Sequence, residues 1–585
     1  RMEVHLDTES HQFEGKQTLF YTNHSPDTLR KVFYHLYFNA FQPGSMMDIR
    51  SQNLPDPDSR VGGKISALEA EEMGYLKVNK LLQDGQETSI IHDETILEVR
   101  LATPMVPGDV ATLEMTFTGQ VPVQIRRSGR DNAEGIAYSM GQWYPKMCAY
   151  DEQGWHANPY VAREFYGVWG NYDVKISLNA KYIVAATGTL QNPDDIGFGY
   201  SDREVFHKPK NDLTWHFKAR NVHDFMWAAD PDYKHESVEV AGGTRLHFFY
   251  QPSKRNQDAW AALPTVMSKA WPMIEDSYGD YPYDSYSFIQ GGDAGMEYPM
   301  ATLITGERSV GSLIGVAIHE VMHAWFHTLL ANNESLYSWM DEGFSTFATS
   351  TIMNQLRKDK SIPGEYTPSP FVDLYNGYRN LIKSGREEPL STHADHFMTN
   401  YGYGVASYTK GAVFLKQLEY IVGNETFNKS MLNYYYKWRF RHPNPNDLIR
   451  IFEKESDLEL DWYREYFVNS IKVIEYGIDA IRAENQTSIV TISKLGTMPM
   501  PIDVEVSYKD GSTSMHTIPL KIMRGAKQSD LGRDVQVEPD WPWTNPSYEL
   551  VIKKSIDKIE SVRIDPSLRL ADFDLSNNMV EPDDN

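Results

Sequence analysis

Apolar and polar residues alternate in several segments of the first two hundred positions. The alternation is clear at Leu113–Phe117 and at Val174–Leu178, and turn residues such as Gly170 and Asn171 separate such segments. A period of two is typical of strands with one buried and one solvent-facing side, as in antiparallel sheets. The sequence therefore predicts an N-terminal β domain, to which we assign residues 1–232.

The pattern changes in the second third of the chain. From Asp258 to about Ser470, long segments carry apolar residues at helical spacing, which predicts a mostly helical domain over residues 233–471. Alternation returns at Ile502–Tyr508, so the sequence predicts a C-terminal β-sandwich over residues 472–585. The fold class that we expect is multidomain α+β, since 585 residues suffice for several domains.

Composition excludes several classes of function. Acidic residues outnumber basic ones by 80 to 56, and the net charge of −24 disfavours nucleic acid as a partner because it repels phosphate. The single cysteine, Cys148, excludes an intrachain disulfide and a Cys-rich zinc module. The most apolar long stretch, Ser312–Ala331, carries four ionisable residues that a lipid-spanning helix would not tolerate, so we expect no membrane-spanning segment. Those residues are His319, Glu320, His323 and His327.

A candidate metal site lies in the middle of the chain, in the run His319-Glu320-Val321-Met322-His323. On a helix, positions i and i+4 share one face, so both imidazoles can reach a single metal ion. The glutamate between them can polarise a metal-bound water without binding the metal itself. The flanking residues support a helix, because apolar residues recur at helical spacing and no proline interrupts them.

Glu342 is the candidate for a third ligand. Eighteen residues separate it from His323, and the surrounding run Ser338–Phe347 reads as a second helix. If that helix packs antiparallel to the first, Glu342 reaches the same metal. Two histidines and one carboxylate leave a fourth tetrahedral position for water, as a catalytic rather than a structural zinc site requires.

These motifs resemble the M1 family of zinc aminopeptidases, which belong to the gluzincins. The family's G-x-M-E-N loop appears upstream as Gly295-Met296-Glu297-Tyr298 preceded by Ala294, with tyrosine in place of the final asparagine. The resemblance implies that Glu297 pairs with the free α-amine of the substrate and that Gly295 and Met296 belong to the same substrate-binding loop. The tyrosine alters the first subsite relative to the family pattern.

Further residues match the family less closely. Tyr408-Thr409-Lys410-Gly411 resembles the Y-x-K-G segment, whose tyrosine stabilises the tetrahedral intermediate, and Tyr403 lies five residues earlier. A phenol suits that role because it keeps its proton at neutral pH. Gln142, in the run Ser139–Pro145, is the candidate for an N-terminal-domain residue beside the substrate amine; a buried strand glutamine is an equally good interpretation.

The resemblance also implies a fold and a location. It implies a saddle-like N-terminal β domain, a thermolysin-like catalytic domain and a C-terminal β-sandwich, without the helical domain that closes the active site of larger members. The variant loop and the Gln142-containing segment look like those of exported bacterial members, which implies an extracytoplasmic location, periplasmic or secreted, with a cytoplasmic one left open. The chain starts at Arg1, so we expect a trimmed N-terminus.

The sequence therefore predicts a zinc aminopeptidase. One Zn²⁺ per chain is held by His319, His323 and Glu342, Glu320 is the general base, Tyr408 is the oxyanion donor, and the partners are peptides with a free N-terminus. Two alternatives stay open: an endopeptidase on the same scaffold, and a zinc-binding module without catalysis. An epoxide hydrolase side activity is open as well, and the residues carry no signal for the preferred N-terminal residue or the oligomeric state.

Overall fold

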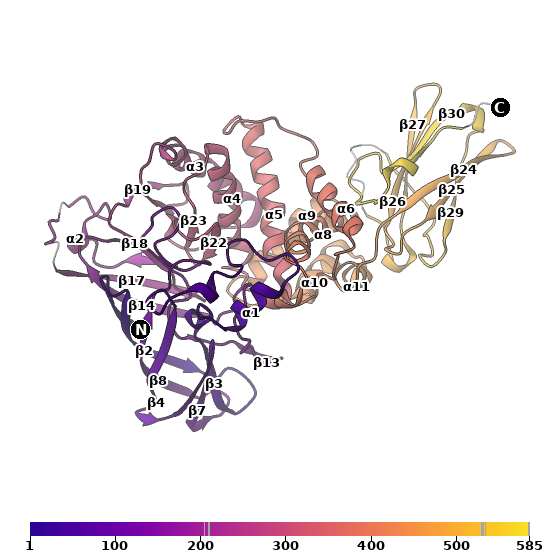
Figure 1. The fold of residues 1–585 in the computed structure, drawn as a ribbon. Coiled ribbons are helices and arrows are strands. Elements are labelled where there is room, and N and C mark those ends of the chain that lie inside the picture. Colours follow the sequence, from indigo (N-terminus) through magenta and orange to yellow (C-terminus); the bar gives the residue numbers. More distant parts are fainter. Residues whose placement is uncertain (204, 209–210, 528–531, 533, 583–585) are drawn as a thin grey trace.

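The computed structural model describes residues 1–203, 205–208, 211–527, 532 and 534–582 of the chain. Its elements form a β-rich N-terminal region, a mostly helical middle and C-terminal sheets. Figure 1 shows the helices of the middle region between the N-terminal strands on one side and the C-terminal sheets on the other. The predicted multidomain α+β organisation is confirmed in this outline.

The N-terminal region is built on an eight-stranded sheet with the order β16-β17-β14-β1-β2-β8-β4-β5. The predicted alternation is confirmed in β8 (Val110–Gln120), which buries Leu113, Met115 and Phe117 and exposes the residues between them. The other strands of this sheet are β1 (Met2–Asp7), β2 (Gln12–Thr22), β4 (Tyr75–Gln83), β5 (Gln86–Glu87), β14 (Gly170–Asn179), β16 (Thr189–Leu190) and β17 (Asp212–Val222).

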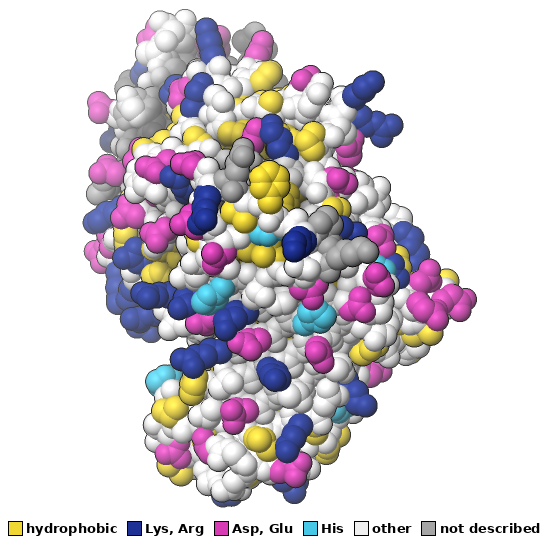
Figure 2. Space-filling model, turned by 90° about the vertical axis from the view of Figure 1, so that its left-hand side faces the viewer, with side chains coloured by type: hydrophobic (Ala, Val, Ile, Leu, Met, Phe, Trp, Pro, Cys, Tyr) yellow, Lys and Arg dark blue, Asp and Glu magenta, His cyan; other side chains and the backbone are white. Residues whose placement is uncertain are grey.

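Two four-stranded sheets complete the main β structure of this region, with the orders β15-β18-β10-β9 and β11-β3-β7-β6. Figure 2 shows the face of the molecule on the N-terminal side, where acidic and basic side chains are interspersed. The strands are β3 (Leu29–His35), β6 (Ser89–Asp93), β7 (Ile96–Met105), β9 (Gly129–Arg130), β10 (Tyr138–Met140), β11 (Lys146–Met147), β15 (Ile183–Ala186) and β18 (Trp227–Asp230).

A five-stranded sheet with the order β19-β20-β21-β23-β22 opens the middle region. The mostly helical middle is confirmed, although the last three strands of this sheet lie within the stretch from Asp258 onward in which helical spacing dominates. β21 is buried along its whole length, so it lacks the alternation that separates a strand from a buried helix in sequence. The strands are β19 (Lys234–Glu239), β20 (Arg245–Tyr250), β21 (Ser285–Gln290), β22 (Gly295–Tyr298) and β23 (Ala301–Ile304).

Helices cover this sheet and form the rest of the middle region, as Figure 1 shows. The buried faces of α3, α4, α5 and α8 share one hydrophobic core. Among the described residues, no helix combines the length and the apolarity that crossing a membrane requires. The helical elements are α3 (Gln257–Tyr278), α4 (Val310–Phe326), α5 (Glu334–Lys358), α6 (Val372–Ser384), α7 (Asn400–Gly404), the π-helical turn η4 (Val405–Lys410), α8 (Gly411–Val422), α9 (Asn424–Trp438), α10 (Pro445–Ser456) and α11 (Asp461–Val468).

The C-terminal region consists of a three-stranded sheet, β24-β25-β29, and a five-stranded sheet, β28-β27-β26-β30-β31. The core of the helical region continues into these sheets. Polar contacts add to it, since the backbone N–H of Asp503 donates to the Tyr420 hydroxyl at 3.0 Å. The strands are β24 (Tyr476–Glu484), β25 (Thr487–Lys494), β26 (Ile502–Tyr508), β27 (Thr513–Ile518), β28 (Gln536–Val537), β29 (Ser547–Ile552), β30 (Ile559–Ile564) and β31 (Met579–Val580).

Candidate active site

Helix α4 carries both histidines of the sequence motif. Ser309 caps its N-terminus by accepting a hydrogen bond from the backbone N–H of Ser312, and apolar residues such as Ile318 and Val321 bury its other face. His319 and His323 lie one turn apart on the same side of the helix. The Nε2 atoms of the two rings are 3.2 Å apart, so both point at one position in space.

Glu342, on α5, completes a triad with the two histidines. Its Oε2 atom is 3.3 Å from His319 Nε2 and 3.4 Å from His323 Nε2. Ligands bound tetrahedrally to zinc at about 2.0–2.1 Å stand about 3.3 Å apart, so the three atoms have the spacing of a zinc site. Glu342 Oε2 is also buried without a hydrogen-bond partner, as expected of an atom that binds a metal ion.

The ionisation of the triad suits a cation. Burial by itself raises the pKa of Glu342, but the close contacts with His319 and His323 and the charges of both rings outweigh burial and lower it. The carboxylate is therefore ionised and available as a ligand. Two imidazole nitrogens and one carboxylate oxygen are ligands that zinc prefers. Together they occupy three positions of a tetrahedron and leave the fourth for water.

Asp341 contacts His323 on the side of the ring that faces away from the triad. The sequence motifs did not predict this residue. Its Oδ1 atom contacts His323 Nδ1, while Nε2 of the same ring faces the triad. The carboxylate therefore accepts the Nδ1 proton and leaves the Nε2 lone pair free for a metal. Asp341 is fully buried, so its charge acts on the ring with little screening by water.

Glu320 projects from helix α4 toward the edge strand β22. A Cβ atom on Gly295 would overlap Glu320 Oε1, so only glycine lets the strand pass this close to the carboxylate. Glu320 Oε2 has no hydrogen-bond partner in the structure. Burial raises the pKa of Glu320 against the opposing charge of His319, which makes it a stronger base than an exposed glutamate.

Glu297 projects from β22 toward the same helix. Its Oε1 atom is 4.0 Å from His323 Nδ1, and its carboxylate lies within 4.8 Å of ligand atoms of both Glu320 and His323. Burial, reinforced by Asp341, Glu342 and Glu320, raises the pKa of Glu297 well above the usual range. A cation placed beside this carboxylate would restore its ionised form, so the position is suited to an ammonium group.

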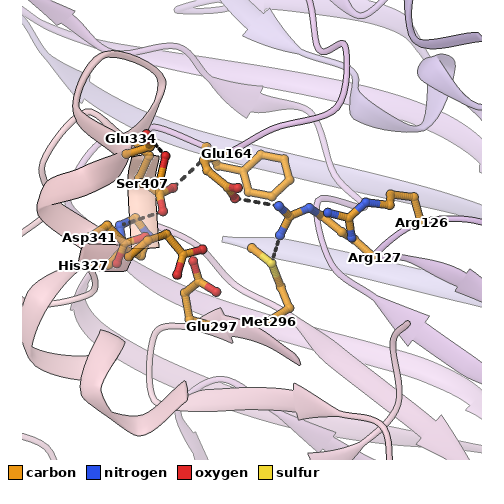
Figure 3. Close-up of polar contacts among 12 residues, drawn as sticks. Arg126, Arg127, Glu164, Met296, Glu297, His327, Glu334, Asp341 and Ser407 are labelled. Carbon is orange, nitrogen blue, oxygen red and sulfur yellow. Dashed lines mark hydrogen bonds and ion pairs between the residues drawn. The ribbon is translucent and has the colours of Figure 1, made fainter. Parts of the chain in front are cut away.

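A second carboxylate, Glu164, reaches the same place from the N-terminal region. Its Oε2 atom accepts a hydrogen bond from Arg127 at 2.6 Å, and its Oε1 atom accepts one from the Tyr403 hydroxyl at 2.7 Å. Carboxylate oxygens of Glu164, Glu297 and Glu334 lie within 4.8 Å of one another. Figure 3 shows Glu164 and Glu297 pointing toward the same space from opposite sides of the domain boundary.

Tyr408 lies on the π-helical turn η4 and contacts Glu342 of the triad. Its hydroxyl donates to Glu342 Oε1, and its ring stacks on His319 with the centroids 5.9 Å apart. Two glycines bring this turn so close: a Cβ atom on Gly343 would lie 2.6 Å from Gly411 backbone atoms. Burial and the charge of Glu342 raise the pKa of Tyr408, so the phenol keeps its proton and acts as a donor.

The structure does not bring every predicted substrate-binding residue into this group. Tyr403 and Gly295 line the cavity over the triad. Met296 points to the opposite face of β22, where its sulfur contacts Arg127. Gln142 is buried elsewhere: its amide donates to Asp224 at 3.2 Å and accepts from the Tyr298 hydroxyl at 2.9 Å.

A cavity of about 620 Å³ lies over the triad, and its volume suits a short peptide. One wall comes from α4 and β22 and another from the N-terminal region, so the site is shared between two regions of the chain. The charged residues that line it include Asp58, Arg60, Arg126, Arg127, Arg163, Glu164, Glu297, Arg308, Glu320 and Glu342.

The region that carries the triad is similar in sequence to known proteins. Residues 299–467 match the model of the peptidase family M1 domain. The middle of the chain is therefore similar to the peptidase family M1 domain. The match agrees with the resemblance that the sequence motifs show to M1 peptidases.

Curated relatives match over part of their length. Aminopeptidase M1-C of Oryza sativa subsp. japonica is 25% identical over 282 residues, which cover 44% of this chain and 31% of the rice protein. Aminopeptidase B of Homo sapiens is 29% identical over 223 residues, covering 33% of this chain and 29% of the human protein. The chain thus spans about a third of the length of these M1 relatives.

Solved structures of the family share the fold. The M1 zinc metallopeptidase from Deinococcus radiodurans aligns with a TM-score of 0.51 at 15% identity, covering 78% of this chain and 89% of that chain. A variant of the same metallopeptidase bound to a Tyr-Ser-Ala substrate aligns with a TM-score of 0.50 at 14% identity, covering 80% and 93%. At this identity the likeness concerns the fold.

Proposed function

We propose that this protein is a zinc aminopeptidase that removes the N-terminal residue of peptides. The observation that carries the proposal is the position of Glu297, whose carboxylate lies within 4.8 Å of ligand atoms of both Glu320 and His323. An α-ammonium held there places the carbonyl of the same residue at the triad. Further residues on the amine side would have to pass the carboxylates of Glu164, Glu297 and Glu334, which lie within 4.8 Å of one another, so the first peptide bond is the one exposed to attack.

The zinc ligands are His319, His323 and Glu342, with one ion per chain. When bound, zinc supplies a Lewis acid that polarises the scissile carbonyl and lowers the pKa of a coordinated water. Tyr408 and Asp341 act beside the triad: the phenol donates a hydrogen bond to the carbonyl oxygen as negative charge develops on it, and the aspartate fixes the tautomer of His323.

Glu320 moves the proton. Its buried carboxylate, with raised pKa, takes a proton from the attacking water and then delivers it to the nitrogen of the leaving group. Gly295 passes close beside this carboxylate, where a larger residue would displace it. General base and general acid are therefore the same residue, acting one after the other.

Glu164 and Glu297 together bind the α-ammonium. Each is buried, and each has a carboxylate oxygen facing the shared space. Glu164 takes the role for which the sequence put forward Gln142. Arg127 and Tyr403 orient Glu164 through hydrogen bonds, so the group is held ready before substrate arrives.

Two other functions use the same residues. An endopeptidase would need space on the amine side of the triad, where Glu297 stands. A zinc-binding module without catalysis would not need Glu320 and Tyr408 beside a complete triad. We further propose a thermolysin-like middle domain, a C-terminal β-sandwich and an extracytoplasmic location, all of which rest on the family resemblance.

A panel of aminoacyl reporters, assayed with and without a chelator, tests the proposal. We expect cleavage that the chelator abolishes and that added zinc restores. Each reporter is paired with its N-acetylated twin, which lacks the ammonium and should not be cleaved. Comparable rates on free and acetylated substrates would favour the endopeptidase, and no cleavage of either would favour the non-catalytic module.

A further inference from the structure

Arg308 is a cation in the wall of the cavity that has no acidic partner within the described residues. Its closest polar contacts are neutral. The other arginines of the cavity are already engaged: Arg60 pairs with Asp58, Arg126 with Asp293 and Arg127 with Glu164, while Arg163 donates to Asn400 and faces the ring of Tyr403. Among the described residues, Arg308 and Arg163 are thus the arginines of this cavity without an acidic partner, and Arg308 in addition has no aromatic ring against its guanidinium.

The neutral contacts fix the Arg308 guanidinium in place. Nε donates to the Thr305 carbonyl at 2.9 Å, Nη2 donates to Thr305 Oγ1 at 2.7 Å, and Nη1 lies 3.3 Å from Ser312 Oγ. A guanidinium has five N–H donors in a planar fork, so these contacts leave donors over for a ligand. A half-buried arginine held in this way is preorganised to bind a carboxylate.

Arg308 stands at one end of a line of site residues along β22 and α4. Glu297 lies beside His323 at the other end, and Gly295 lies beside Glu320 and Val316 in the middle. Thr305, which holds Arg308, donates through its backbone N–H to the Ala294 carbonyl at 2.7 Å, just before β22 begins. The order along the cavity is therefore amine anchor, general base, then arginine.

The length of this line corresponds to a short peptide. Glu297 and Gly295 are two strand residues apart, or about 7 Å. From Val316, beside Gly295, to Ser312, beside Arg308, is one turn of α4, or about 6 Å. Part of the resulting distance is spanned by the Glu297 and Arg308 side chains themselves. An extended chain of three residues covers about 10 Å, so its two ends can meet the two charged side chains.

β22 is also able to hold a peptide in this direction. It is the edge strand of its sheet and pairs only with β23 within the described residues. An extended peptide can add to such an edge through backbone hydrogen bonds. With its ammonium at Glu297 and its first carbonyl at Glu320, the rest of the peptide runs toward Arg308.

From this geometry we infer that Arg308 binds the C-terminal carboxylate of substrates of up to three residues. The protein is then selective for di- and tripeptides that carry both a free amine and a free carboxylate. This inference deepens the proposed aminopeptidase function and rests on it. The positive charge of Arg308 is a local feature of the cavity, because the molecule as a whole has a net charge of −24.

The test compares peptide acids with their C-terminal amides, which differ only in the charge that Arg308 would bind. We expect the unmodified protein to cleave a tripeptide acid about 10- to 100-fold more efficiently, in kcat/KM, than its amide, the size of a charge-assisted hydrogen bond. The preference should be small for a hexapeptide, whose carboxylate lies beyond Arg308. Equal kcat/KM for acid and amide, or an equal preference at six residues, would overturn the inference.

Two variants assign the preference to the residue. Arg308→Gln should reduce the acid-to-amide ratio toward one, whereas Arg308→Lys should keep part of it. Arg255→Gln removes a positive charge from an exposed position of the same region and should leave the ratio unchanged. An unaltered ratio in a folded Arg308→Gln protein would contradict the assignment, and thermal unfolding checks that the variant is folded.

Binding gives a readout that does not depend on turnover. With Glu320→Gln as the background, calorimetry with the tripeptide acid and its amide should reproduce the ratio as a difference in Kd. Aminoacyl reporters without a carboxylate test the aminopeptidase function separately. If the reporters are cleaved and acids are not preferred, only the role of Arg308 fails; if the reporters are not cleaved, the proposed function fails.

Discussion

The carboxylate of Asp341 contacts Nδ1 of His323, on the side of the ring opposite to the triad. Both side chains are buried. The contact fixes which nitrogen carries the proton, and it also holds the plane of the ring in the direction that the other ligands require. Metal binding in this protein should therefore depend on a residue that does not touch the metal.

Asp341→Asn should weaken zinc binding about 10- to 100-fold, because an amide accepts the Nδ1 proton without the negative charge that strengthens the ligand. Zinc affinity is measured by competition with a chelator, and zinc content by elemental analysis. His323→Ala is the matched control and should lose the metal together with activity. Unchanged zinc affinity in Asp341→Asn would show that the aspartate is only a packing residue.

Glu320→Gln should keep zinc and the fold but lose most of its turnover. The amide cannot take a proton from water, and general base action contributes about 10²–10⁴-fold. Steady-state kinetics on an aminoacyl reporter, with zinc content measured in the same sample, separates loss of chemistry from loss of metal. A loss of only a few-fold in kcat would assign the proton transfer to another residue.

Tyr408→Phe should lower kcat with little change in KM. The hydroxyl meets an oxygen that becomes negatively charged only in the transition state, and losing one such donor costs about 3–4 kcal/mol in the best case. The ring, which stacks on His319, is retained in phenylalanine. A raised KM with kcat unchanged would instead identify Tyr408 as a substrate-binding group.

Glu164→Gln should lower kcat/KM for free-amine peptides by about tenfold or more, because the ammonium loses one of its two charged partners. Acetylated peptides, which have no ammonium, provide the comparison. Gln142→Ala tests the sequence-based candidate in parallel: its buried hydrogen bonds to Asp224 and Tyr298 make a loss of stability the expected result. Weakened amine preference in Gln142→Ala alone would restore the original assignment.

Asp395 should make stability depend on pH. Burial raises the pKa of Asp395 to about 6, although Arg50 and Arg163 oppose the shift. A carboxyl group with a raised pKa in the folded state contributes stability below pH 4, which is lost as the pH rises through 6. Asp395→Asn does not ionise, so its stability relative to the unmodified protein should increase between pH 4 and pH 7, by at most about 3 kcal/mol.

Denaturant unfolding at several pH values measures this difference. Asp276→Asn, at an exposed position on α3, is the control and should show no such trend. A constant difference between Asp395→Asn and the unmodified protein across the range would contradict the prediction.

The histidine pair of the triad could be predicted from the sequence because its geometry is local. Helical periodicity puts His319 and His323 on one face, whereas Glu342 reaches them through the packing of α5 against α4.

Glu164 could not be found in this way. It lies outside any helix or strand, in the N-terminal region, and only the packing of that region on the middle region brings it to Glu297. The buried strand β21 escaped prediction for a related reason, since its burial depends on layers on both faces. Contacts between distant segments are set by tertiary packing, which no local pattern records.

Glu164 belongs to the N-terminal region and Glu297 to the middle region. A substrate whose ammonium contacts both carboxylates would therefore connect the two regions. A bound amine would be held by one carboxylate from each region, and the hydrogen bond from Tyr403 to Glu164 already spans the same boundary. Thermodynamic linkage then requires that whatever tightens this boundary strengthens amine binding, and that amine binding tightens the boundary to the same extent. Binding of an amine and contact between the two regions would then be parts of one equilibrium.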